Sequence, residues 1–178
     1  MSELRRPLFA GRYYPPAAAQ LQTMIAAYVE DAPVAATARP LVGLIVPHAP
    51  LYEAGPVAGF AFKALMLASQ SWDVAVLIAQ ARDCAPICCD PRDGYQLPDG
   101  QVMPLLDGWA ALAGVNRQVD EDPQIEMALP FLSYALGTVP ILPLRVGPGA
   151  EAQLTASQLP ERSLIVVIAN LADASLLR

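Results

Sequence analysis

The hydrophobic residues of this chain gather into four short continuous runs, separated by segments with helical spacing. The runs occupy residues 41–46, 74–78, 139–146 and 163–169. They are rich in β-branched and aliphatic side chains, and runs of this kind predict strands buried on both faces, as in a parallel sheet. The run 139–146 contains Pro140 and Pro143. An internal proline favours a position away from the centre of a sheet.

Helical periodicity occupies the intervals between these runs. Leu21, Met24, Ile25 and Tyr28 follow i, i+3, i+4, i+7 spacing and predict the buried stripe of a helix over residues 15–30. Further helices are predicted at residues 55–69, 107–113, 124–136 and 151–159. The inner face of the first of these is expected to carry Val57, Phe60, Ala61 and Leu65. Alternating strands and helices predict one α/β domain over residues 1–178, with a mostly parallel central sheet flanked by helices.

The segment 79–106 is rich in turn-forming residues, including DPRDG at 90–94 and PDG at 98–100. We expect loops there with one short antiparallel pair, residues 87–89 against 101–103. Cys84, Cys88 and Cys89 are the three cysteines of the chain. Their odd number, and an N-terminus without a secretory signal, predict reduced, small apolar residues and not a disulfide framework.

The composition of the chain argues against two classes of function, nucleic-acid binding and membrane insertion. Hydrophobic residues make up 54%, charged residues 16%, and the net charge is −6. An acidic protein lacks the basic surface on which nucleic-acid binding depends, and no apolar run approaches the roughly 20 residues that span a bilayer. We therefore expect a cytoplasmic protein that binds neither nucleic acid nor membrane. The low charge fraction leaves apolar surface to cover, which favours a homodimer.

His48 is the only histidine, and it follows directly after the run 41–46. Ligands of open α/β sheets bind beyond the carboxyl ends of the strands. The sequence therefore indicates a site around His48 more clearly than it indicates a reaction.

Five motifs in matching order resemble the MEMO family, also called AmmeMemoRadiSam system protein B. They are AGRYYP at 10–15, PHA at 47–49, GPVA at 55–58, the spaced Tyr95, Pro98, Gly100 and Val102, and EMALPFL at 126–132. That family is similar in fold to the class III extradiol ring-cleavage dioxygenases. The resemblance implies the same α/β fold, but family members continue beyond the last strand found here. We therefore expect a single MEMO-like domain that lacks the family's C-terminal part.

The departures from the family pattern concern its metal ligands. His48 matches the first family histidine, whereas Arg82 replaces the second and Pro123 occupies the position of the third. At the last motif, Asp173 stands in the place of a histidine. Non-haem iron sites use two histidines and a carboxylate. The resemblance therefore implies a degenerate site.

Two functions remain open from the sequence. The first is a non-catalytic module that binds a small molecule or a protein, without a cofactor. Arg82 and His48 would then hold an anionic ligand, or Arg82 would pair internally with Asp83, Asp122 or Asp173. The second is an iron-dependent, dioxygenase-like oxidoreductase with His48 as metal ligand beside acidic residues. A related alternative is a subunit whose pocket is completed by a partner chain that carries the missing ligands. The predicted pocket residues are His48, Tyr52, Arg82, Cys84, Asp122, Glu126 and Asp173.

Overall fold

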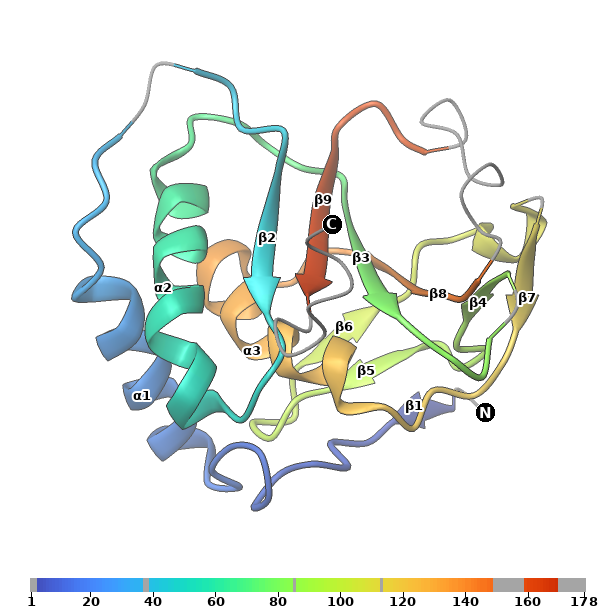
Figure 1. Cartoon of the computed structure of the whole chain (residues 1–178), viewed down its shortest axis with the longest axis horizontal. Coiled ribbons are helices and arrows are strands. Elements are labelled where there is room, and N and C mark those ends of the chain that lie inside the picture. The colour runs from blue at the N-terminus through green and yellow to red at the C-terminus, as the bar shows by residue number, and fades with distance from the viewer. Residues whose placement is uncertain (1–2, 37–38, 85, 113, 149–158, 170–178) are drawn as a thin grey trace.

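The central feature of the computed structural model, which describes residues 3–36, 39–84, 86–112, 114–148 and 159–169, is a six-stranded sheet (Figure 1). Its strand order is β2-β9-β3-β8-β4-β7. Neighbouring strands are parallel except at the β8–β4 pair, which is antiparallel. The strands are β2 (Gly43–Pro47), β3 (Val74–Gln80), β4 (Ile87–Cys89), β7 (Val115–Arg117), β8 (Ile141–Val146) and β9 (Ser163–Ala169).

Three α-helices accompany the sheet in the described part of the chain: α1 (Ala18–Glu30), α2 (Leu51–Leu67) and α3 (Pro123–Leu136). Helix α2 contacts β2, α3 contacts β3 and β9, and α1 packs on α2 and α3. A single turn of 3-10 helix spans Trp109–Ala111, within the short helix predicted there. The predicted α/β fold with a mostly parallel sheet is confirmed. Residues 151–158 of the helix predicted at 151–159 lie outside the described residues. No described helix has the length and apolar character needed to cross a membrane.

A smaller sheet joins the N-terminal segment to a hairpin. It contains β1 (Leu4–Arg5), β5 (Gly94–Gln96) and β6 (Val102–Pro104) in the order β1-β5-β6. The predicted pairing of 87–89 with 101–103 is wrong, because residues 87–89 form β4 of the main sheet. The turn after Leu97 instead brings β6 back onto β5, with Tyr95 opposite Met103.

The prediction that prolines keep 139–146 from the centre of the sheet is also wrong. Strand β8 lies between β3 and β4. The Pro140 carbonyl accepts a hydrogen bond from β3, and the Val146 carbonyl accepts one from the residue that follows β3. The Ile141 carbonyl points to the opposite side of β8, away from β3. Because backbone groups alternate in direction along a strand, the Pro143 nitrogen also points away from β3. On that side β4 ends at Cys89, opposite Leu144, so Pro143 lies beyond the end of the β4 pairing. No hydrogen bond to β3 is lost, so the proline is tolerated.

Strand β2 lies at one edge of the sheet and is buried on one face only, not on both faces as expected. Leu44 and Val46 are buried, but the Ile45 side chain is 73% exposed. The apolar run correctly predicted a strand but could not indicate its place in the sheet.

Helix α2 begins at Leu51, before the predicted start at residue 55, and it presents a different face to the core. Of the predicted inner face, Leu65 is buried and Ala61 is half-buried, but Val57 and Phe60 are exposed and Phe62 is buried instead. The buried face is set by the crossing with α1, where α2 approaches closely at Gly55 and Gly59. A Cβ atom at Gly59 would lie 2.2 Å from the Tyr28 carbonyl oxygen, so only glycine permits this crossing.

The cysteines also correct the sequence interpretation. Cys84 and Cys88 form a disulfide with a Cα–Cα distance of 6.0 Å, and Cys89 is free and buried. The bond joins the loop after β3 to β4. Spacing could not reveal it, because the approach of these segments depends on the pairing of β4 with β8.

We predict that Gly59→Ala destabilises the protein. Helix propensity alone would instead raise the free energy of unfolding by about 1 kcal/mol. The added methyl group meets the α1 backbone, so the expected loss in the free energy of unfolding is about 1–3 kcal/mol. Urea unfolding measures the change. Ala64→Gly, on the same helix, is the control for propensity. A Gly59→Ala protein as stable as the parent would contradict the tight crossing.

Candidate functional site

The predicted site lies at the edge of the sheet where β2, β9 and β3 end (Figure 1). The three strands are parallel, so their carboxyl ends meet there. His48 follows β2 directly, and its backbone N–H donates to the Ala169 carbonyl at 2.9 Å. This bond continues the β2–β9 ladder by one residue and fixes the His48 backbone at the edge.

The His48 side chain is half-buried beside an aromatic neighbour. Its ring is stacked with that of Tyr13, with 6.4 Å between the ring centroids. The Nε2 atom is buried and has no hydrogen-bond partner among the described residues. Burial lowers the pKa of His48 below its ordinary value of 6.5, and the negative charge of Asp122 opposes this shift. The imidazole is therefore neutral at pH 7.

Gln124 brings the start of α3 to the same edge. Its Nε2 donates to the Gln80 carbonyl at the end of β3, at 2.8 Å. Its Oε1 is buried without a partner in the described part of the chain. Gln124, Pro47, Ala49 and Ile168 help line a cavity of about 10 Å³. That volume suits about one water molecule.

Asp122 is the N-cap of α3. Its carboxylate accepts from the Gln124 backbone N–H at 2.8 Å, which satisfies one of the free amides at the helix start. Its carbonyl accepts from the Arg5 side chain at 2.9 Å. Asp122 thus lies close enough to act electrostatically on His48 while serving as a structural cap.

Glu126 lies one turn further along α3 and is almost completely buried. One carboxylate oxygen accepts from the Phe9 backbone at 2.9 Å and the Tyr14 hydroxyl at 2.6 Å. The other pairs with Arg5 and accepts from the Leu8 backbone at 3.2 Å. Burial and the bond to Glu126 raise the Tyr14 pKa far above its ordinary value. Glu126 thus holds the N-terminal segment against α3.

Asp120 and its neighbours extend this buried network. Asp120 accepts from the Tyr95 hydroxyl at 3.0 Å, and its carboxylate lies 3.8 Å from Arg5 and 3.7 Å from Arg145. Arg145 also pairs with Asp83, and the hydrogen bond from Arg145 lowers the Asp83 pKa. Asp83, one of the partners predicted for Arg82, is therefore held by Arg145.

The remaining predicted residues take different positions. Arg82 follows β3 at the same edge as His48. Tyr52 is 63% exposed on the first turn of α2 and shares a shallow groove with Tyr13. Cys84 is 1% exposed and bonded to Cys88, so it offers no thiolate. Asp173 lies outside the described residues.

Sequence reasoning missed Tyr13 and Gln124. Tyr13 lies in the AGRYYP motif, which gave no indication that its ring stacks with that of His48. Gln124 gave no sequence signal beyond its place behind the Asp122 cap.

The described residues do not fit a non-haem iron centre. Such a centre needs two histidines and a carboxylate on one face, and His48 is the only histidine. The Glu126 carboxylate is fully engaged by Arg5, Tyr14 and two backbone amides. Within the described ranges, no three histidine, cysteine, aspartate or glutamate side chains converge on a point that could hold a metal.

The geometry defines an α/β protein with a candidate binding site at the carboxyl edge of a parallel sheet. Residues 5–168 match the family model of the Memo-like proteins, and the chain belongs to that family. It is 28% identical over 152 residues to a MEMO1 family protein of Methanococcoides burtonii, covering 81% of this chain and 55% of that protein. It is 26% identical over 158 residues to one of Thermotoga neapolitana, covering 79% and 57%. The chain thus spans a little over half the length of these relatives.

We predict that Glu126→Gln destabilises the fold by about 3–5 kcal/mol, because it leaves the Arg5 charge buried without its partner. Chemical denaturation measures the loss. Asp73→Asn is the matched control, since it breaks the exposed pair with Arg162 and should leave stability nearly unchanged. Equal effects of the two substitutions would contradict a structural role for Glu126.

A second prediction concerns the His48 proton. The single imidazole should titrate below pH 6.5 in an NMR experiment, and Asp122→Asn should lower its pKa further by removing the charge that favours the imidazolium. Asp107→Asn is the control. The unfolded chain takes up this proton at higher pH than the native protein. The free energy of unfolding should therefore fall as pH is lowered from 6.5 toward the native pKa. His48→Gln should abolish this part of the pH dependence, and a pKa at or above 6.5 would contradict the burial of the ring.

Proposed function

We propose that this chain is a non-catalytic binding module of the Memo-like family, with its ligand site around His48 at the ends of β2 and β3. The main support for the proposal is that the acidic side chains near His48 already have partners within the protein. Glu126 is held by Arg5 and Tyr14, and Asp122 caps α3. An iron-dependent oxidoreductase would need such carboxylates as ligands beside His48.

The ligand proposed for this site carries an anionic group. Arg82 and His48 follow β3 and β2, which flank β9, so the two residues lie at the same edge of the sheet. Both side chains can donate to a carboxylate or a phosphate. Tyr13, stacked with His48, offers an aromatic surface beside the anion. The neutral state of His48 limits binding at pH 7, so affinity should rise as the imidazole becomes protonated.

A homodimer remains part of the proposal. Val42, just before the edge strand β2, and Ile45 within it are exposed, and α2 exposes Val57 and Phe60. Exposed apolar side chains on an unpaired edge support association with a second copy.

The first test is iron loading. The protein and His48→Ala are incubated anaerobically with Fe(II), desalted, and analysed for metal. We expect no stoichiometric iron in either protein. About one iron per chain, lost in His48→Ala, would overturn the non-catalytic function in favour of the oxidoreductase.

The second test titrates inorganic phosphate at pH 7.5 and 5.5 and follows the His48 imidazole by NMR. We expect tighter binding at pH 5.5 and about tenfold weaker binding in Arg82→Gln, which removes a charge-assisted hydrogen bond. Arg39→Gln, before the opposite end of β2, is the control. No effect of Arg82→Gln beyond that of the control would contradict the proposed anion site.

A further inference from the structure

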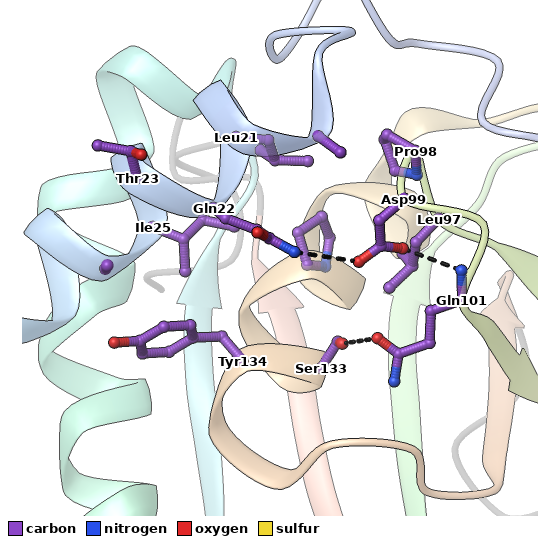
Figure 2. Close-up of a pocket in the computed structure, with 13 residues that line it drawn as sticks. Leu21, Gln22, Thr23, Ile25, Leu97, Pro98, Asp99, Gln101, Ser133 and Tyr134 are labelled. Atoms are coloured by element: carbon purple, nitrogen blue, oxygen red, sulfur yellow. Dashed lines mark hydrogen bonds between the residues drawn. The ribbon is translucent and has the colours of Figure 1, made fainter.

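A cavity separate from the His48 site lies between α1, the turn that joins β5 to β6, and α3 (Figure 2). Its volume is about 450 Å³, within the range of small-molecule sites. Leu21 and Ile25 of α1 form its apolar wall together with Leu97 and Pro130, all of them buried. A ligand held there would place an apolar body against these side chains.

The turn at the mouth of this cavity has a fixed shape. The Gly100 N–H donates to the Leu97 carbonyl at 2.9 Å, and the Leu97 N–H donates to the Gln101 carbonyl at 2.8 Å. Gly100 has φ +86°, which glycine adopts readily. Pro98 restricts the first corner. This geometry fixes the backbone of Asp99 at the rim of the cavity.

Two polar side chains of the cavity lining, Gln101 and Asp99, already have hydrogen-bond partners in the structure. The Gln101 amide donates to Thr138 at 2.7 Å and accepts from Ser133 at 2.6 Å, so it is satisfied without a ligand. The Asp99 carboxylate accepts from the Gln101 backbone at 3.0 Å and from the Gln22 amide at 3.3 Å (Figure 2). Both of these donors are neutral.

The charge of Asp99 is therefore not balanced by the residues that line the cavity. No arginine, lysine or histidine is among them, and Asp99 is their only ionised side chain. A carboxylate at the rim of an apolar cavity is complementary to a cation that carries an apolar body.

We propose that this cavity is a second binding site, separate from the His48 site, for a small organic amine. The ammonium group pairs with Asp99 and displaces the long bond from Gln22. The apolar body lies between Leu21 and Pro130. This inference does not depend on the proposed function, because the two sites share none of their described residues.

The test compares three probes that share a phenylethyl body and differ in the polar group at its end: 2-phenylethylamine, 2-phenylethanol and 3-phenylpropanoate. Binding to the full chain is measured by NMR titration. We expect the amine to bind more tightly than the alcohol, and the acid to bind most weakly. Asp99→Asn should weaken amine binding about fivefold, the scale of one partly exposed ion pair, and leave alcohol binding unchanged.

Two variants make the test specific. Asp107→Asn changes the net charge equally but lies outside the cavity lining, so it should leave amine binding unchanged. Ala26→Trp fills the cavity from α1 and should abolish binding of both amine and alcohol, with the NMR spectrum confirming that the fold is retained. Equal binding of amine and alcohol, equal losses in Asp99→Asn and Asp107→Asn, or undiminished binding in folded Ala26→Trp would each overturn the proposal. A loss of phosphate binding at His48 would leave it standing.

Discussion

The buried charge of Arg5 imposes the strongest constraint on this structure. Its guanidinium is fully buried, pairs with Glu126, donates to the carbonyls of Asp120 and Asp122, and lies 5.0 Å from the centre of the Tyr95 ring. A charge removed from water must meet fixed partners, or the folded state loses stability. These partners come from α3, the loop before it and β5. One side chain therefore ties the N-terminal segment, the small sheet and the first turn of α3 into a single arrangement.

The same network also engages carboxylates close to His48. Glu126 and Asp122 would be the obvious acidic partners for a metal at His48, yet both serve the architecture. His48 is left with Tyr13, with the charge of Asp122, and with a buried Nε2 that no described residue satisfies. An imidazole in this setting is suited to recognise a ligand, because it can donate or accept one hydrogen bond without a metal.

The cavity between α1 and α3 has a different physical character from the strand-end site. Its walls come from helices and a hairpin turn, whereas His48 depends on the register of β2 with β9. The cavity between α1 and α3 has an apolar wall and one carboxylate, whereas the site proposed around His48 has an imidazole and an arginine.

Local patterns determined much of the fold from the sequence alone. The four apolar runs became β2, β3, β8 and β9, the periodic segment ending near Glu30 became α1, and the helix predicted at 124–136 became α3. These features depend on residues within a few positions of each other, which periodicity and capping rules describe. The place of His48 after its strand followed from the same local information.

Only the tertiary structure decided the strand order, the edge position of β2, the buried face of α2 and the Cys84–Cys88 bond. It also decided that Glu126 supports the fold, because its partner Arg5 lies 121 positions away in the sequence. Such pairings depend on which segments meet when charge and apolar surface leave water, and no local pattern encodes that choice. The sequence therefore indicated where the proposed site lies, and the long-range packing determined that Glu126 and Cys84 of the predicted set are engaged elsewhere in the structure.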